Sequence, residues 1–380
     1  MANAWAEVSM IAAEALMHLE DGLVIARSVA RDKTSDFMVR PNGYAVGDTI
    51  SIKTRPEFVV STFTSSIAVQ DVRESKRSMQ IENHYDVSVQ ITAKEKALDL
   101  ESFSEQVIKP AAYALAAQCD IYVGTKILQA RGEYASTTLF TTAADMALAR
   151  KTANLQQLDP TSRICLVDPT LEAALLGATY FSTWTNRGES GRTVFDQAMM
   201  GYAMGMNFVA SVNFPTYTHT RSSGTTTVNT TSGTTSLVGM TTLTVAAIAG
   251  GFLAGDRILI AGAKRPLKVS SGGAALATTI VLVDPIDEPL VHGAAVTVSS
   301  AGASITAARG AIFDSSAMAV AMPMLDPPSD KPSAIVSNNG YSIRVVQGYD
   351  MTTKKDTLSM DLLIGAVAYD ARRITLLTAR

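Results

Sequence analysis

One long amphipathic stretch, residues 102–131, constrains the fold of this chain more than any other segment. Its apolar residues recur at spacings of three and four, which predicts one buried face on a helix that begins near Ala111. Those residues are Ala112, Leu115, Ala116, Cys119, Val123, Ile127 and Ala130. Pro110 suits a first helical turn, and Gly132 suits a helix end. A helix of about 20 residues is about 30 Å long, so the pattern predicts either an ordinary core helix or an elongated spine.

Composition narrows the class of protein. The chain has 380 residues, enough for two or three domains with real cores. Its 47% hydrophobic and 18% charged residues argue against disorder. No apolar run reaches the roughly 18 residues of a membrane span, and Glu7 and Glu14 interrupt any signal-like N-terminus. The net charge of −3 gives no electrostatic case for tight binding of nucleic acid, although loose contact with DNA stays open.

The chemistry-bearing residues form no recognisable site. Two cysteines make neither a disulfide framework nor a metal quartet, so Cys119 and Cys165 are predicted to be buried, reduced thiols in a cytoplasmic protein. The four histidines lie in four separate segments and are predicted to be surface or cap residues: His18, His84, His219 and His292. Phosphate-binding glycine motifs and a nucleophile elbow are absent. The sequence predicts no enzyme, no catalytic residues, no cofactor and no metal, but a site assembled from distant residues would leave no such signal.

The first third of the chain predicts a helix and then a long β excursion. Residues 4–20 carry an amphipathic pattern that Asp21-Gly22 ends. From Gly47 the apolar period changes to two, and residues 50–69 and 79–91 read as an outgoing and a returning strand. A two-stranded ribbon has no core of its own and is only marginally stable in water. It is therefore either an arm that lies on a neighbouring subunit or a hairpin that packs on its own domain.

The charged tip of this excursion is the candidate interface between subunits. If the excursion is an arm, its charged tip contacts a neighbouring subunit, and if it is a hairpin packed on its own domain, the tip is not an interface. The predicted interface residues are Arg55, Glu57, Phe58, Asp71, Arg73, Glu74, Lys76 and Arg77.

The middle of the chain alternates helical and strand patterns. Residues 143–158 predict a helix, Ile164–Val167 a buried strand, and Asp168-Pro169 the capped start of a helix through Leu176. A further helix is predicted at 194–204, followed by a strand at 208–212.

At Pro215 the composition shifts sharply. From Thr216 to Gly255, Arg221 is the only charged residue, and threonine, serine and glycine dominate. Short strands between turn residues predict a small all-β barrel or sandwich inserted at about 216–309. The predicted strands are Leu243–Val245, Arg257–Ile260, Thr279–Val283 and Val296–Val298. The opening run TRSSGTTTVNTTSGTT is rich enough in threonine and serine to be a flexible loop instead of a strand.

The order of these parts resembles the major capsid proteins of tailed bacteriophages, which have the Hong Kong 97-type fold. More narrowly, it resembles the podophage coat proteins that carry an inserted β-domain. The likeness lies in four segments and their order: IAAEALMHLEDGLVIARSVARD at 11–32, VGDTISIKTRPEF at 46–58, VSVQITAKEKALDLESFSEQVIKPAAYALA at 87–116 and AGDRILIAG at 254–262. It covers the first third of the chain well and the remainder by pattern only.

The resemblance implies an α+β fold with a defined set of parts. They are an N-terminal arm at 1–45, an extended β loop at 46–92, a peripheral domain with the spine helix at 93–159, a first axial part at 160–215, the inserted β-domain at 216–309, an axial return at 310–335 and C-terminal peripheral strands at 336–380. The implied function is that of a shell subunit which forms pentamers and hexamers, closes into an icosahedral procapsid and expands on DNA packaging.

The implied partners are further copies of the chain, a scaffolding protein, a portal protein, loosely held double-stranded DNA and, optionally, a decoration protein, with no membrane. The implied location is the virion capsid, assembled in the host cytoplasm. The segment before residue 46 is too short for a fused scaffold, so a separate scaffolding protein and no large N-terminal cleavage are expected. The alternatives are an encapsulin-like shell protein, which shares the fold, a β-rich tail or surface protein, and an enzyme without a visible site.

Overall fold

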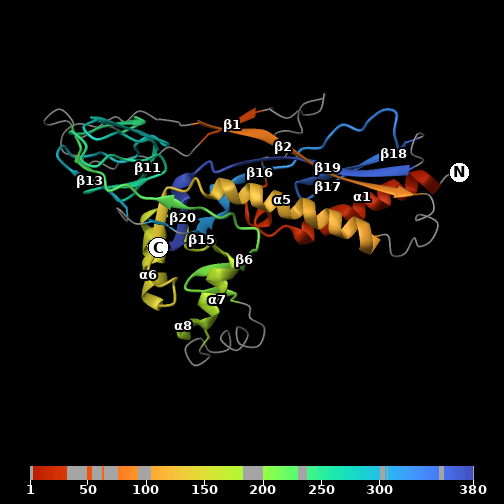
Figure 1. Cartoon of the computed structure of the whole chain (residues 1–380), viewed down its shortest axis with the longest axis horizontal. Helices are drawn as coiled ribbons and strands as arrows, with labels where there is room; N and C mark the ends of the chain where they lie inside the picture. The colour runs from red at the N-terminus through yellow and green to blue at the C-terminus, as the bar shows by residue number, and fades with distance from the viewer. Residues whose placement is uncertain are drawn as a thin grey trace. The chain divides into compact units, whose positions relative to one another are not determined.

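The structure is a computed structural model of the whole chain (Figure 1). The residues it describes are 3–31, 49–53, 62–63, 76–92, 104–182, 200–229, 238–299, 304–305, 307–350 and 355–379. The chain divides into two compact units. Unit 1 takes Met1–Ile52, Arg77–Lys126 and Ser315–Tyr369, and unit 2 takes Lys53–Lys76, Ile127–Asp314 and Asp370–Arg380.

Unit 1 is built on a six-stranded sheet with helices packed on one face (Figure 1). Its main strand order is β1-β2-β19-β18-β17, and β16 pairs with β19. The strands are β1 (Thr49–Lys53), β2 (Lys76–Thr92), β19 (Lys355–Val367), β18 (Tyr341–Asp350), β17 (Ser333–Asn338) and β16 (Ala319–Ala321). The helices are α1 (Asn3–Gly22) and α5 (Lys109–Ile127), with shorter turns η1 (Ala26–Ser28), η2 (Ser104–Ile108) and η3 (Ser315–Ala317).

Helix α1 confirms the helix predicted at 4–20. Its apolar stripe is buried against β17 and β18, because Val8, Ala12, Leu16 and Leu19 are each at most 3% exposed. Burial of such a stripe is what stabilises an amphipathic helix of this length in water. The apolar face of α1 from Val8 to Leu19 is therefore part of the core of unit 1.

Helix α5 confirms the spine helix but corrects its end. The prediction extended it to Arg131, whereas it stops at Ile127. Gly132 is not a helix stop; it is the first residue of strand β3 (Gly132–Ser136), where a Cβ would lie 2.6 Å from the Thr375 hydroxyl oxygen. The continued apolar spacing to Ala130 reflects residues buried in a turn, because Ala130 still donates its N–H to the Ile127 carbonyl at 3.0 Å.

Unit 2 contains a second six-stranded sheet, of mixed direction, in the order β3-β20-β15-β4-β6-β5. Strand β15 is antiparallel to both neighbours, whereas β20 and β3 are parallel, as are β4 and β6. The strands besides β3 are β20 (Ile374–Ala379), β15 (Ala307–Asp314), β4 (Arg163–Val167), β6 (Met206–Ala210) and β5 (Tyr202–Ala203). Turn η4 (Ala371–Arg373) precedes β20.

The helices of this sheet begin where the sequence provides caps. Helix α6 (Ala143–Leu155) starts at Thr142, whose hydroxyl accepts the Asp145 N–H at 3.3 Å. Helix α7 (Pro169–Gly177) starts at Asp168, whose carboxylate accepts the Leu171 N–H at 2.7 Å, and α8 (Thr179–Ser182) follows. These caps satisfy amide donors that the helix itself leaves unpaired.

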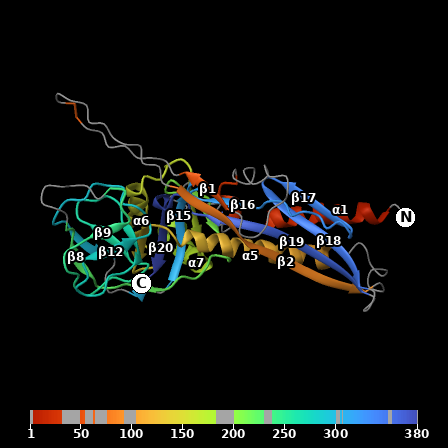
Figure 2. The ribbon, with the colours of Figure 1, turned by 90° about the horizontal axis from the view of Figure 1, so that it is seen from above.

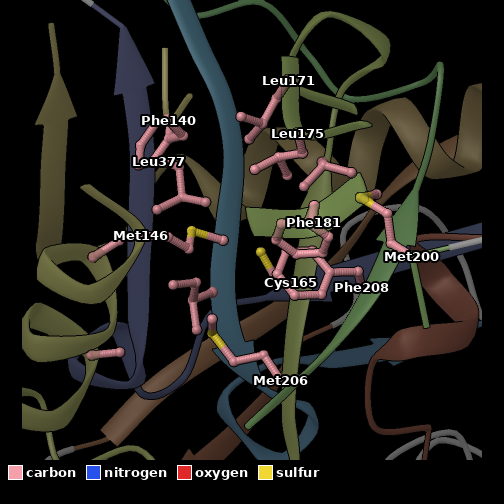
Figure 3. Close-up of a cluster of buried hydrophobic side chains, with 14 of the residues drawn as sticks. Phe140, Met146, Cys165, Leu171, Leu175, Phe181, Met200, Met206, Phe208 and Leu377 are labelled. Atoms are coloured by element: carbon pink, nitrogen blue, oxygen red, sulfur yellow. The ribbon is translucent and has the colours of Figure 1, made fainter. Parts of the chain in front are cut away.

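The core of this sheet gathers aromatic and methionine side chains from strands and helices that lie far apart in the sequence (Figure 3). Phe181 meets Phe208 edge to face, with ring centroids 5.2 Å apart. Met146 and Met206 are fully buried here, so at these two positions the methionines act as packing residues.

Residues 225–298 form a separate antiparallel sheet between β6 and β15, in the order β8-β13-β10-β11-β12-β9. Its strands are β8 (Thr225–Thr227), β13 (Ala295–Val298), β10 (Arg257–Ile260), β11 (Leu267–Ser271), β12 (Thr279–Leu282) and β9 (Thr242–Thr244). Bridges from Val228 to Val245 and from Thr225 to Ala249 join its two ends. The sheet therefore closes into a small barrel around its own apolar core, and closure removes its free edges. A short pair, β7 (His219–Thr220) with β14 (Ser304–Ile305), stands before and after it.

Several predictions of helices and strands need correction. Strands β8 and β11 were not predicted, and the opening run expected as a loop contains β8, while residues 230–237 lie outside the described part. In the helix expected at 194–204, residues 200–204 are not helical. Strand β5 forms there, and Gly201, Met204 and the following Gly205 have positive φ. The earlier residues of the expected helix lie outside the described part.

The predicted domain borders also cross the two units. Strand β3 and helix α6, expected with the spine at 93–159, belong to unit 2. Residues 315–335, expected with the axial return at 310–335, belong to unit 1, and β20, expected with the C-terminal strands at 336–380, belongs to unit 2.

Candidate assembly surfaces

The predicted interface residues fall mostly outside the described part of the chain. Arg55, Glu57, Phe58, Asp71, Arg73 and Glu74 cannot be placed for that reason. Lys76 and Arg77 open strand β2, where Lys76 is exposed and Arg77 is half-buried. The charged tip of the excursion therefore stays a prediction.

The returning half of the excursion packs on its own unit. Strand β2 pairs with β19 continuously from Ile81 to Thr92, with one irregularity beside Ile364 and Gly365. Of the two alternatives left open by the sequence, residues 77–92 follow the second, a strand embedded in its own sheet. This half has a core because β19 and β18 extend the sheet beside it.

A row of polar side chains crosses the face of this sheet away from the helices. Tyr85 of β2 bonds to Gln118 of α5, so the alternate residues His84 and Asp86 point to the other face. There Asp361 of β19 binds His84 Nε2 at 2.9 Å and accepts from the Arg344 guanidinium of β18. His84 is therefore engaged by a carboxylate, which the sequence did not indicate.

The segment after α1 is fixed to the spine helix by one buried carboxylate. Asp120 of α5 accepts the backbone N–H groups of Val24, Ile25 and Ala26 at 2.9, 3.1 and 2.9 Å. The Asp120 side chain thereby caps turn η1, although it lies 94 to 96 residues further along the sequence. No local motif announces this cap, because the carboxylate comes from another helix.

The same segment continues along the core of unit 1. Ala30 forms a parallel bridge to Ala319, and the Val320 N–H donates to the Ala30 carbonyl at 3.0 Å. The Arg31 guanidinium then lies 4.8 Å from the centroid of the Tyr341 ring. The N-terminal arm predicted at 1–45 is thus integrated into the fold up to residue 31.

Unit 2 contains a buried ionic cluster between its mixed sheet and its barrel. Glu133 of β3 accepts from the guanidinium of Arg221 and, at 3.2 Å, from that of Arg257 in β10. Its other oxygen accepts the Thr378 hydroxyl at 3.0 Å. Arg257 also donates twice to the Ala130 carbonyl, at 3.2 and 3.0 Å. We call Glu133, Arg221 and Arg257 the buried triad.

Two further charge groups surround the triad. Asp256, adjacent to Arg257 in the chain, binds His219 Nε2 at 3.0 Å and the Ser222 hydroxyl at 2.5 Å. The Arg131 guanidinium donates to both oxygens of Asp287, at 3.2 and 3.0 Å. His219 therefore packs on a fully buried carboxylate and is not a simple surface residue. Together these contacts fix the barrel to the mixed sheet through many desolvated charges.

Charge pairing lowers the pKa of the acids in this region. Burial raises the pKa of the Glu133 carboxyl, but the charges of Arg257 and Arg221 and their hydrogen bonds outweigh burial and hold that pKa below its ordinary value. Burial likewise raises the pKa of the Asp287 carboxyl, but the charges and hydrogen bonds of Arg131 and Arg265 outweigh burial and hold that pKa below its ordinary value. Both carboxylates are consequently ionised wherever the fold is intact at neutral pH.

Acid should destabilise unit 2 through these two groups. Each folded-state pKa lies below its unfolded-state value of about 4, so the stabilisation is fully present above that value and is lost as the pH falls through the folded-state pKa. We expect the urea midpoint to fall steeply below about pH 4. Glu133→Gln should flatten that dependence, whereas the exposed Glu105→Gln should leave it as steep as in the natural chain. If the urea midpoint of Glu133→Gln fell as steeply with pH as that of the natural chain, Glu133 would not be a source of the acid sensitivity.

Other chemistry-bearing groups have structural surroundings. Cys119 and Cys165 are completely buried, and burial raises the pKa of both thiols. Within the described ranges no cluster of three or more histidine, cysteine or acidic side chains could hold a metal ion. No described helix is both long enough and apolar enough to cross a bilayer.

No protein-family model matches the chain, and no curated protein matches its sequence. Many solved structures align with it, and the following three do so at low identity. One described as Mycobacterium phage Che8 aligns at 10% identity over 93% of this chain and 90% of that chain, with a TM-score of 0.50. The capsid structure of Cyanophage P-SCSP1u aligns at 13% identity over 90% and 85%, with a TM-score of 0.47. The asymmetric unit of the bacteriophage PhiM1 mature capsid aligns at 12% over 87% and 82%, with a TM-score of 0.46.

The first of these matches extends over nearly the full length of both chains. At this identity it shows a shared fold, so the chain has the same mixed α+β fold as that phage structure. The resemblance to tailed-phage coat proteins that the sequence indicated is confirmed at the level of the fold.

Proposed function

We propose that the chain is the major capsid protein of a tailed double-stranded DNA bacteriophage. Copies assemble as pentamers and hexamers into an icosahedral shell through a scaffolded procapsid, which expands as the genome enters. The observation that carries the proposal is the fold shared with the Mycobacterium phage Che8 structure over 93% of the chain. The order of sequence segments supports it independently, because it matches the arm, loop, spine and inserted domain of the Hong Kong 97-type coat proteins.

The parts of that fold have natural counterparts here. The spine is α5, the inserted domain is the barrel of residues 225–298, and the extended loop is the segment that leads into β2. The partners are other copies of the chain, a separate scaffolding protein, a portal protein and a decoration protein, all in the virion or its precursor. A net charge of −3 suits a wall that holds packaged DNA only loosely.

Negative-stain electron microscopy of the purified protein, expressed alone and with its candidate scaffold, tests the proposal. We expect closed particles of uniform size or tubular shells, because a subunit of this class carries its assembly contacts in its own fold. A monodisperse monomer under both conditions would overturn the proposal. Particles that enclose a folded enzyme in place of DNA would favour the encapsulin-like alternative.

Charge reversal at the tip of the extended loop should separate folding from assembly. The variant with Arg73, Lys76 and Arg77 changed to Glu should still give a folded monomer, because the change at exposed Lys76 should cost about 0.5 kcal/mol or less and half-buried Arg77 lies at the start of strand β2, outside the part that pairs with β19. Its yield of particles should fall at least tenfold. The control reverses the exposed Lys151 and Lys264 and should assemble normally. Normal particles from the triple variant would show that the tip is not an interface.

A further inference from the structure

Strand β17 forms an open edge of the sheet in unit 1. It is the last strand in the order β1-β2-β19-β18-β17, and no strand of the described part pairs with its outer side. Figure 2 shows β17 at the margin of the sheet, beside β18. An open edge presents unpaired N–H and C=O groups to any further strand, and folded proteins ordinarily protect it.

The register identifies which groups face outward. Ser333 lies opposite Val346, and the Gln347 N–H donates to the Pro332 carbonyl at 2.9 Å. In an antiparallel pair, hydrogen-bonded positions alternate, so 334, 336 and 338 bond to β18 while Ser333, Ile335 and Ser337 point their amide groups outward. The closing Asn339-Gly340 turn, with φ of 51° and 84°, has the two positive φ values typical of a tight hairpin.

Within the strand itself none of the usual protective devices is present, and Lys331 and Pro332 only precede it. The sequence Ser333–Asn338 contains no charged residue and no proline, and its register with β18 runs without a bulge. Its first four residues are half-buried and its last two are exposed. Helix α1 packs against β17 and β18 but leaves the outer N–H and C=O groups of the edge without a partner strand.

We propose that β17 pairs antiparallel with β17 of a second copy of this chain, across a two-fold axis at Ile335. The pairing deepens the proposed function and rests on it, since it assigns one contact between subunits of the shell. Both sheets would then continue as one sheet through the contact. A two-fold contact of this kind is made by the same surface on both copies, so it needs no second binding site.

The sequence of β17 is self-complementary in this register. Ile335 lies opposite Ile335 of the partner subunit, which places two β-branched apolar side chains side by side. Ser333 lies opposite Ser337 of the partner subunit, which pairs two hydroxyl side chains. Lys331, just before the strand, lies opposite Asn339 of the partner subunit, so no like charges meet. A partner strand of another protein would require none of this symmetry, which favours a second copy.

Cysteine cross-linking tests the pairing in the full-length protein. Residues opposite each other in a hydrogen-bonded antiparallel pair have Cα atoms about 5.5 Å apart, within the range of about 4.4–6.8 Å for a disulfide. Ile335→Cys alone should therefore give a covalent dimer under mild oxidation. The natural thiols Cys119 and Cys165 are completely buried and should not contribute.

The matched controls use the same strand. Ser333→Cys alone and Ser337→Cys alone should give no dimer. Each new thiol lies four residues along the strand from its own counterpart, and at about 3.4 Å per residue that is about 14 Å. A mixture of the two variants should give the mixed dimer. Adding Ile335→Lys to that mixture should abolish it, since two like charges then meet at the axis. Equal cross-linking of all three single-cysteine variants would indicate random collision and overturn the register.

Electron microscopy of the same samples separates this inference from the proposed function. Normal shells without the Ile335→Cys dimer would overturn the pairing and leave the shell protein. A dimer without shells would support the pairing and overturn the shell. Absence of both would overturn both.

Discussion

Replacing Glu133 by glutamine is expected to lower the free energy of unfolding by about 3–5 kcal/mol, the usual cost of breaking a buried ion pair on one side. Glu133 has almost no contact with water, and Arg221 and Arg257 are equally buried. The amide cannot neutralise two guanidinium groups, so Arg257 loses its carboxylate partner, and Arg221 keeps only Asp256, whose Oδ1 lies 4.0 Å from its Nη1. Urea unfolding followed by far-ultraviolet circular dichroism measures the loss. The exposed Glu105→Gln is the matched control and should cost less than about 0.5 kcal/mol.

Replacing all three residues of the buried triad should cost less stability than replacing Glu133 alone. Changing Glu133 to Leu together with Arg221 and Arg257 to Met removes all three charges at once. Because desolvation of buried ions often cancels their attraction, such an apolar replacement is expected to cost far less than the single Glu133→Gln change. Arg257 also serves the Ala130 carbonyl, so some loss of about 1 kcal/mol per missing hydrogen bond should remain. A triple variant less stable than the single one would contradict this account.

Local patterns predicted the elements of this fold well where the signal is itself local. The capped helix start at Asp168 and the strand Arg257–Ile260 appear where the sequence placed them, and helix α6 starts at the predicted residue 143. Strand β3 was missed because GEYAS has no clear alternation, and it exists through its parallel pairing with β20. The apparent helix through Arg131 has a similar cause. Arg131 is buried by its bonds to Asp287, 156 residues away, and not by helical packing.

The buried clusters could not be predicted, since their members are distant in the sequence. Glu133 and Arg221 are separated by 88 residues, and Glu133 and Arg257 by 124. One signal did exist: Arg221 is the only charged residue in a long run of threonine, serine and glycine. A lone charge in such a segment is worth treating as a candidate for burial against a distant partner. The predicted interface at the loop tip, by contrast, depends on contacts between chains, which the sequence of one chain does not specify.

Replacing Asp120 by alanine should destabilise unit 1 by about 3–5 kcal/mol. The change leaves three amide donors without an acceptor, and each unsatisfied buried donor costs about 1–3 kcal/mol. The Ile25 and Ala26 bonds are buried, whereas that of Val24 is partly exposed, so water can relieve only one of them. The stability of Asp120→Asn should lie between that of Asp120→Ala and that of the natural chain. The single side-chain carbonyl oxygen of Asn can accept from some of the three donors, but its amide nitrogen can accept from none.

Hydrogen exchange distinguishes this role of Asp120 from a general loss of packing. The amides of Val24, Ile25 and Ala26 should exchange fastest relative to the natural chain, while those of β18 and β19 change only as far as global stability falls. The exposed Asp21→Ala serves as the control and should alter neither pattern. Unchanged protection at residues 24–26 in Asp120→Ala would mean that the carboxylate does not hold the segment. That segment continues through Ala30 to Ala319, so its release should loosen the chain between α1 and β16, while the apolar stripe of α1 keeps its own packing against β17 and β18.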